Sequence, residues 1–215
     1  DRPQVMGIVN VTPDSFSDGG LHLDVDAAIA HGLRLLEEGA DILDIGGEST
    51  RPGAAPVSVQ DEIARVVPVI EALVAQVQVP VSVDTCKPEV MRAALAAGAC
   101  MVNDVQALRQ PGALDAVADS NAAVVLMHAV GGPHDAGVAW DSDDVAGDVQ
   151  RFLAERIFAA EMAGIGRNRL VVDPGYGFNK NTMQNFALLA AQEKLLALGV
   201  PLLAVGLSAG TLLPR

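Results

Sequence analysis

The stretch VMGIVNVTPDSFSDGG (residues 5–20) contains the pattern on which the fold prediction rests. It starts with an apolar run at residues 5–9 and breaks at Asn10 into a loop of Thr, Pro, Asp, Ser and Gly. This change is typical of a buried strand that opens into a polar loop. A loop of this composition packs poorly, so its role as a binding element is the first question that the sequence raises.

Apolar runs of the same kind recur along the chain, at residues 42–45, 79–83, 100–102, 124–127, 170–172 and 202–205. Helical patterns separate them, at residues 24–40, 59–76, 87–99, 111–122, 144–165 and 183–199. Several of the helices are expected to end at a glycine: Gly39, Gly98, Gly164 and Gly199. Continuous apolar strands that alternate with helices predict a parallel sheet covered on both faces.

Polar residues at the strand ends favour a barrel over an open, doubly wound sheet. One polar side chain lies at or just beyond the end of each predicted strand: Asn10, Asp44, Asp84, Asn103, His128, Asp173 and Ser208. In a barrel these ends converge on one face, whereas an open sheet concentrates its ligand groups near one switch point. We therefore predict an α/β fold of the (β/α)8 TIM-barrel type, in one domain that spans residues 1–215.

Composition excludes several classes of partner. The 215 residues carry a net charge of −13, and a nucleic-acid groove requires a basic stripe instead. No apolar stretch reaches the roughly 18 to 20 residues that span a bilayer, and we expect neither a signal peptide nor a membrane partner. The two cysteines, Cys86 and Cys100, predict reduced thiols in a cytoplasmic protein.

The segment DIGGESTRPG (residues 44–53) joins a strand end to a glycine-rich loop with Thr50 and Arg51. Glycines let backbone N–H groups approach an anion, and the arginine guanidinium fits phosphate oxygens. The alternative is an ordinary turn with a solvated arginine. The later segment GYGF (residues 175–178) is not a dinucleotide-binding fingerprint, because position 180 is Lys instead of Gly.

Three strand-end residues, Asp84, Asn103 and Asp173, indicate the ligand class. Carboxylates accept hydrogen bonds from amino and ring N–H groups, and an asparagine side chain donates and accepts. A 2-amino-4-oxo heterocycle such as a pterin or guanine has a matching edge. Each aspartate taken alone is also compatible with a helix cap or turn.

Other residues leave two interpretations open. His128 is either a pocket residue or a structural imidazole, and Met127 packs either on a flat ligand or in the core. Cys86 is either reactive or, as we expect, an inert buried thiol. Residues 129–144 form either a lid or a surface loop. The histidines have no spacing that suits zinc.

With these motifs in view, the sequence resembles the dihydropteroate synthase family of pterin-binding enzymes, the targets of sulfonamide inhibitors. The motifs occur in the family's order: MGIVNVTPDSFSDGG, DIGGESTRPG, SVDT, VND, LMH and DPGYGFNK. The resemblance implies a (β/α)8 barrel that condenses 6-hydroxymethyl-7,8-dihydropterin pyrophosphate with p-aminobenzoate and releases pyrophosphate. It also implies a homodimer.

The resemblance further assigns roles to residues of this chain. Asp84, Asn103 and Asp173 would hold the pterin edge, with Met127 and Phe178 beside the rings. Asn10 would be an oxygen ligand of Mg2+, the implied cofactor, which binds the pyrophosphate. The remaining substrate-binding residues are Thr50, Arg51 and Pro52 of the second loop, together with Asp44, Gly206 and Ser208.

The mechanism implied by this likeness is a dissociative substitution. Mg2+ and Arg51 would stabilise the departing pyrophosphate, and Asp84 would favour the cationic methylene left behind. The loop at residues 10–20 would close over this charged intermediate and keep water out. Asp84, Arg51 and Asn10 are thus the expected catalytic residues.

The sequence departs from the family after its seventh predicted strand. Ser208 is followed by Ala209 and Gly210, where the family has Arg and Lys, and no eighth strand is predicted. We therefore expect a truncated or altered form, either with little catalytic activity or with its missing strand supplied otherwise. If 215 residues is the true length, we predict weak pterin binding and negligible turnover. Two alternative functions are a catalytically impaired pterin-binding remnant and a methyltransferase of the methyltetrahydrofolate–corrinoid type.

Overall fold

A computed structural model describes residues 2–12, 20–49, 55–129, 131 and 140–204. It contains six parallel strands that pair in the order in which they occur along the chain. They are β1 (Met6–Asn10), β2 (Ile42–Gly46), β3 (Val81–Asp84), β4 (Met101–Asp104), β5 (Ala123–Met127) and β6 (Leu170–Asp173).

The helices follow the strands in strict alternation up to β6. They are α1 (Gly20–Glu37), α2 (Val59–Val74), α3 (Pro88–Ala96), α4 (Ala113–Ala118), α5 (Val145–Met162), α6 (Thr182–Ala190) and α7 (Gln192–Leu196), with a short 3-10 turn at Arg167–Arg169 before β6. None of the helices in the described ranges combines the length and apolar character needed to cross a membrane.

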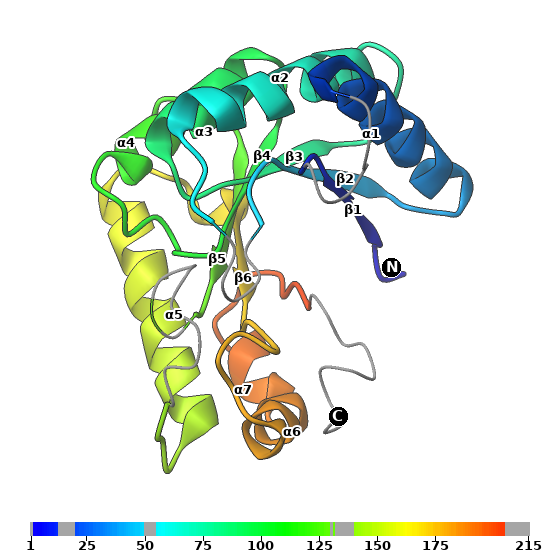
Figure 1. Ribbon diagram of the computed structural model, residues 1–215. Helices are drawn as coiled ribbons and strands as arrows, with labels where there is room; N and C mark the ends of the chain where they lie inside the picture. Colours follow the sequence, from blue (N-terminus) through cyan, green and yellow to red (C-terminus); the bar gives the residue numbers. More distant parts are fainter. Residues whose placement is uncertain (1, 13–19, 50–54, 130, 132–139, 205–215) are drawn as a thin grey trace.

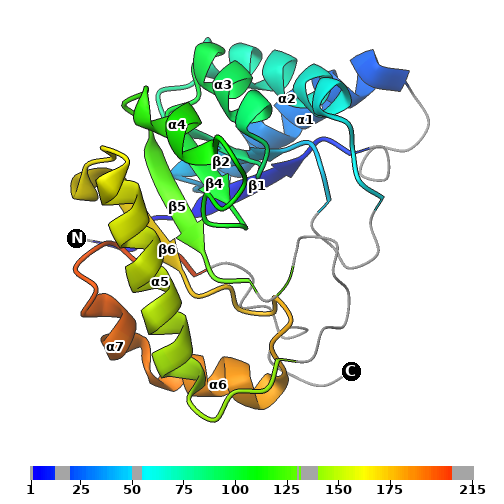
Figure 2. The same cartoon turned by 90° about the vertical axis from the view of Figure 1, so that its left-hand side faces the viewer.

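The strand order confirms the predicted barrel class. In a doubly wound sheet the order reverses at a switch point, which puts helices on both faces. Here every strand pairs with the next one, so right-handed crossovers place all the connecting helices on the same side. Helices α1 to α5 follow one another along the outer side of the curved sheet (Figures 1 and 2). The sequential order is that of a (β/α)8 barrel.

Side chains alternate between two environments along each strand, and this alternation sets up the site. Residues such as Leu43, Ile45, Val83 and Val102 point outward and form one buried apolar core with the helices. Their neighbours on the inner face are polar at several positions: Asn10, Asp44, Ser82, Asp84, Asn103 and Asp173. The inner face of the strands therefore carries polar groups where an ordinary barrel interior is filled by branched apolar side chains.

Several sequence predictions are refined by the structure. All four predicted cap glycines, Gly39, Gly98, Gly164 and Gly199, have positive φ angles, as predicted. The predicted helix at residues 183–199 is wrong in its continuity, because α6 and α7 are separated at Ala191, whose φ of −105° is not helical. Within the described part, the predicted strand at residues 202–205 is a single parallel bridge between Leu202 and Val172.

Candidate active site

Three buried polar side chains meet on the inner face of neighbouring strands β2, β3 and β4. The Asn103 Nδ2 atom donates a 2.8 Å hydrogen bond to Asp44 Oδ2. Among the described residues, the Asp44 Oδ1, Ser82 Oγ and Asn103 Oδ1 atoms are buried without a hydrogen-bond partner. A buried polar atom without a partner costs about 1–3 kcal/mol. Such a concentration of unpartnered atoms at one place indicates a ligand site.

Asp84 lies at the end of β3, directly opposite Asn103 in the strand register. Burial is the main cause that raises the pKa of Asp84 well above its usual value; repulsion by four other carboxylates adds to it, from Asp44, Asp104, Glu62 and Glu48. Burial likewise raises the pKa of Asp44, although the hydrogen bond from Asn103 and the nearby Ser82 hydroxyl oppose the shift. This environment disfavours further negative charge and favours N–H donors or a cation.

Asp173 ends β6 and lies opposite Met127 in the register. Its Oδ1 atom accepts a 2.7 Å hydrogen bond from the Gly175 N–H group. Burial raises the pKa of Asp173 to about 7, and the hydrogen bond from Gly175 and the nearby Lys180 oppose that shift. Burial lowers the pKa of Lys180 itself to about 7. Lys180 Nζ in turn donates to the carbonyl oxygens of Gly175 at 2.8 Å and His128 at 3.1 Å, which ties the ends of β5 and β6 together.

The turn that follows β6 requires a glycine at position 175. Its φ of +67° lies in the left-handed region, and a Cβ atom there would lie 2.0 Å from the His128 carbonyl oxygen. No other residue type fits this position without moving the chain. The glycine thus lets the backbone turn back onto the Asp173 carboxylate.

Asn10 ends β1 on the same inner face and is exposed at the mouth of the barrel. Gly46 separates it from Asp84. A Cβ atom on Gly46 would lie 3.5 Å from Asn10 Oδ1 and 3.7 Å from Asp84 Oδ2, so the glycine keeps the space between the two oxygen atoms open. The described residues contain no group of three or more histidine, cysteine, aspartate or glutamate side chains arranged as metal ligands.

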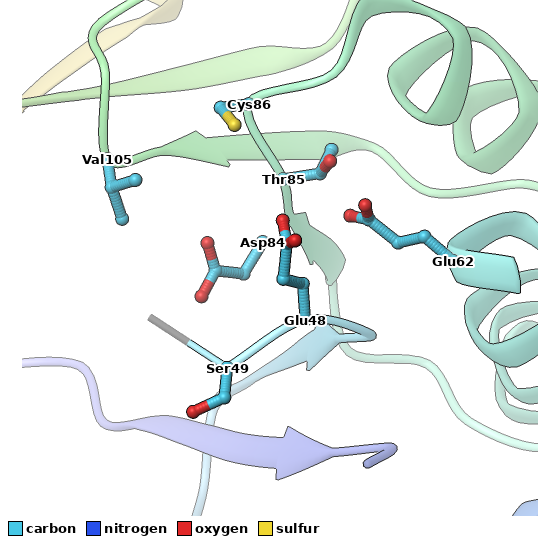
Figure 3. A pocket seen from close by; sticks show the side chains of 7 residues that line it. All are labelled: Glu48, Ser49, Glu62, Asp84, Thr85, Cys86 and Val105. Atoms are coloured by element: carbon cyan, nitrogen blue, oxygen red, sulfur yellow. The ribbon is translucent and has the colours of Figure 1, made fainter. Parts of the chain in front are cut away.

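A hollow beside Asp84 is lined by residues from several elements: Glu48, Ser49, Glu62, Asp84, Thr85, Cys86 and Val105 (Figure 3). Glu62 extends from α2 toward the end of β3 in this view. Lys87 forms ion pairs with Glu48, at 2.8 Å, and with Glu62. The sequence reasoning missed these three charged residues.

The sequence contains a signal for one of these three charged residues, Glu62. Glu62 occupies the buried stripe of α2 together with Val66, Val69, Ile70 and Leu73. This is the spacing of an apolar helix face, on which an acid is unusual. Lys87 and Glu48, by contrast, are 39 residues apart, and only the fold brings them together.

Cys86 and Asp104 have structural surroundings, and His128 is enclosed by aromatic rings although its buried Nδ1 atom has no hydrogen-bond partner among the described residues. The His128 ring packs against Trp140 and Phe152, at ring-centroid distances of 5.1 and 5.0 Å, and burial lowers its pKa to about 3. Burial raises the pKa of the Cys86 thiol to about 12, in line with the inert thiol that we expected. Asp104 points away from Asn103 by strand alternation and accepts hydrogen bonds from the N–H groups of Gln106 and Leu108.

The structure places six of the predicted site residues on the inner face of the sheet, at or near the carboxyl ends of the strands, one on each of the six strands. They are Asn10, Asp44, Asp84, Asn103, Met127 and Asp173. Asp44 differs from the prediction in that it lies within β2 instead of at its end, because the strand continues to Gly46. Met127 is buried on the inner face, and Phe178 is half-buried in the loop after β6.

Other predicted positions lie outside the described residues. These are Thr50, Arg51, Pro52, Gly206 and Ser208, together with much of the segments 10–20 and 129–144.

A barrel with a pocket of carboxylate and amide groups at the carboxyl ends of its strands defines an enzyme class that binds a small, nitrogen-rich heterocycle. The profile of one protein family, described as "Pterin binding enzyme", matches residues 6–212, and the chain belongs to this family.

Its relatives include dihydropteroate synthases. The enzyme of Escherichia coli K12 is 48% identical over 207 residues, which cover 96% of this chain and 73% of the relative. The structure of Xanthomonas albilineans dihydropteroate synthase with 4-aminobenzoic acid has 68% identity and a TM-score of 0.88, and the match covers 95% of this chain and 72% of that one. The Yersinia pestis enzyme in a sulfonamide complex has 49% identity and a TM-score of 0.91, with 98% and 76% covered.

The raised pKa of Asp173 predicts a measurable effect on stability. The folded protein binds a proton at Asp173 up to about pH 7, whereas an unfolded aspartate loses it near pH 4. The free energy of unfolding contributed by this group therefore falls as the pH rises from about 4 to 7. The substitution Asp173→Asn should raise the free energy of unfolding by about 1–3 kcal/mol at pH 8 and by little at pH 4.5.

Urea denaturation of both proteins at the two pH values measures this difference. If Asp173→Asn changes the free energy of unfolding equally at both pH values, the pKa of Asp173 is not raised in the folded protein.

Proposed function

We propose that this chain acts as a dihydropteroate synthase, which joins 6-hydroxymethyl-7,8-dihydropterin pyrophosphate to p-aminobenzoate and releases pyrophosphate. The observation that carries the proposal is the set of unpartnered buried atoms of Asp44, Ser82 and Asn103 beside Asp84. A family of pterin-binding enzymes and relatives named dihydropteroate synthase support it. The reaction is a transferase reaction of folate biosynthesis.

In this proposal the pterin edge takes the place of the missing hydrogen-bond partners. Asp173 and Asp84 accept from amino and ring N–H groups, and Asn103 uses its free Oδ1 atom in the same way. Asp44 holds Asn103 in position through their hydrogen bond. Met127 and Phe178 lie near Asp173 along the chain and the sheet, where they would border the flat ring.

The chemistry needs charge stabilisation more than proton transfer. The bond between the pterin methylene carbon and the pyrophosphate oxygen breaks, and its electron pair leaves with pyrophosphate. The aniline nitrogen then forms the new bond with its own lone pair and loses a proton to water. The Asp84 carboxylate stabilises the cationic methylene between these events, and Arg51 assists the leaving group.

Mg2+ is part of this proposal, and Asn10 fits it. The exposed Asn10 Oδ1 atom beside the open face of Gly46 is a hard oxygen ligand of the kind that Mg2+ prefers. When bound, the ion would neutralise charge on the pyrophosphate. The second loop, with Thr50, Arg51 and Pro52, and the later residues Gly206 and Ser208 would complete the substrate site, which is also where sulfonamides compete with p-aminobenzoate.

The proposal also covers the oligomeric state and the cellular location of the protein. Five of its exposed large hydrophobic side chains lie on the last three helices: Phe158, Met162, Met183, Phe186 and Leu196. Such exposure supports a homodimer that buries one or more of these helices. The two cysteines are free thiols, which supports a cytoplasmic location.

The activity itself gives the first test. The purified protein should form dihydropteroate and release pyrophosphate in equal amounts when p-aminobenzoate and the pterin pyrophosphate are both present, and Asp84→Asn should lower kcat about 100- to 1,000-fold because the cation loses its carboxylate. Glu71→Gln, which removes an exposed charge from α2, serves as the control.

Two other outcomes would contradict the proposal. Calorimetric pterin binding without turnover would favour the impaired remnant. Methyl transfer from methyltetrahydrofolate without pyrophosphate release would favour the corrinoid-type methyltransferase.

The metal assignment has its own test. Asn10→Ala should raise the Mg2+ concentration at half-maximal activity about tenfold or more, since it removes an oxygen ligand, while the KM for p-aminobenzoate stays within about twofold. An unchanged Mg2+ dependence would remove Asn10 from the metal site.

The dimer is tested by sedimentation equilibrium. We expect a mass of two chains for the native protein, and a shift toward one chain for Phe158→Glu and for Phe186→Glu, measured separately because either helix can form the interface. A monomeric native protein at micromolar concentration would contradict the homodimer.

A further inference from the structure

The turn at residues 105–108, directly after β4, has an unusual backbone conformation. Ala107 and Leu108 have φ angles of +53° and +57°, in the left-handed region, although neither is a glycine. A residue with a Cβ atom is strained in this region, and two such residues in succession are uncommon. Both residues are also buried, at 0% and 1% exposure. Backbone strain of this kind persists only where neighbouring groups fix the chain, and it concentrates at functional sites.

Asp104 fixes the turn from the side of the strand. Three successive N–H groups donate to this one residue: Gln106 to Oδ1 at 2.7 Å, Leu108 to Oδ2 at 2.7 Å, and Ala107 to the main-chain carbonyl oxygen at 2.9 Å. Asp104 is 0% exposed. The left-handed residues are what allow three consecutive donors to converge on one acid, as in a backbone anion nest.

Arg156 fixes the same turn from the side of the helices. It belongs to α5, which covers β5 on the outer side of the sheet (Figure 2). Its Nε atom donates to the Ala107 carbonyl oxygen at 2.8 Å, and its Nη2 atom donates to that of Leu108 at 3.3 Å. Asp104 thus accepts from the N–H groups of the two strained residues, and Arg156 donates to their carbonyl groups.

The charge of the Asp104 carboxylate is also supported. Burial raises the pKa of Asp104 to about 6; the two backbone hydrogen bonds oppose this shift, and so do Arg109 and Arg156. The carboxylate is therefore mostly ionised at pH 7, so that both oxygen atoms are acceptors.

The turn begins next to a residue of the proposed pterin site. Asn103 precedes Asp104 and points to the inner face, where its Nδ2 atom binds Asp44 and its Oδ1 atom is left for a ligand. The last residue of β4 in register with a neighbour is Asp104, opposite Leu126. The sheet alone does not fix the chain after this point. An error of about 1 Å in the position of a binding group is enough to weaken a site.

We propose that Asp104 and Arg156 are positioning residues, which hold the 105–108 turn in its left-handed conformation and thereby direct the Asn103 side chain at the pterin edge. This inference rests on the proposed function and deepens it, because it assigns part of the pterin affinity to two residues that do not touch the ligand. A merely structural role is the alternative, in which the turn only caps the end of β4.

Calorimetric titration with 6-hydroxymethylpterin, well below the Tm of each protein, tests the proposal. Asp104→Asn keeps the shape of the side chain but replaces one acceptor by an amide, and we expect the Kd to rise about tenfold. Arg156→Gln should raise it about threefold or more. Arg151→Gln, which changes an exposed arginine of the same helix, is the matched control and should leave the Kd unchanged. A native Kd in both Asp104→Asn and Arg156→Gln, with only the Tm lowered, would establish the structural role and overturn the proposal.

Relief of the strain gives a second test. Glycine adopts a positive φ without strain, so adding Ala107→Gly to Asp104→Asn should bring the Kd back to within about threefold of the native value. Ala116→Gly, at a buried alanine within α4, is the control and should give no recovery. The same pair is made in Arg156→Gln should Asp104→Asn fail to fold. Absence of recovery with Ala107→Gly, or equal recovery with Ala116→Gly, would contradict the role of the turn.

A readout on the free protein keeps this test separate from that of the proposed function. The NMR signals of the Asn103 side-chain amide, assigned with Asn103→Ser, should shift and exchange their hydrogens at least tenfold faster in Asp104→Asn and in Arg156→Gln. The buried Asn185 amide, which donates to Lys180 and Asn181 carbonyl oxygens, should stay unchanged. Unmoved Asn103 signals, or equal changes at Asn185, would contradict the positioning role whatever the affinity. Absence of pterin binding by the native protein would contradict the proposed function instead.

Discussion

The hydrogen bond from Asn103 to Asp44 is the interaction on which the site depends. It joins β4 to β2 across the inner face of β3, at 2.8 Å, and uses one polar atom of each side chain. The other oxygen of each side chain is left buried without a partner, and the Ser82 hydroxyl adds a third unpartnered atom between them. The bond therefore orients two acceptor atoms, Asp44 Oδ1 and Asn103 Oδ1, into the barrel. No described residue donates a hydrogen bond of ordinary geometry to either of them. This is the condition under which a ligand with N–H donors binds strongly, because it replaces absent hydrogen bonds instead of competing with existing ones.

The same arrangement is costly for stability. Asp44, Asp84 and Asp173 all have raised pKa values, with burial as the first cause in each case. An enzyme that stabilises a cation needs such an environment, since preorganised negative charge is most effective where water is excluded. The outer face of the same strands compensates, because it is a continuous apolar core with the helices. Strand alternation thus divides the fold into an outer layer that provides stability and an inner one that provides chemistry.

Much of this fold could be predicted from the sequence, because apolar runs and polar loop starts are local signals. They located the strands, the barrel class and the inner residues Asp84, Asn103 and Asp173. The signals do not specify which face a side chain takes when strand length is uncertain, so the depth of Asp44 within β2 was missed. They also cannot reveal contacts between distant segments, such as the ion pair of Lys87 with Glu48. The role of His128 was ambiguous for the same reason, since only the packed structure shows that the aromatic rings of Trp140 and Phe152 contact it.

Proton release on pterin binding tests the central claim most directly. Calorimetric titration with 6-hydroxymethylpterin at pH 7, in two buffers that differ in heat of ionisation, measures it. Asp173 and the adjacent Lys180 both have pKa values of about 7, and N–H groups of the ring favour the ionised form of Asp173. The account predicts that the native protein releases more protons on binding than Asp173→Asn does. Equal proton release by the two proteins, or the absence of binding, would contradict the claim that these buried carboxylates receive the pterin.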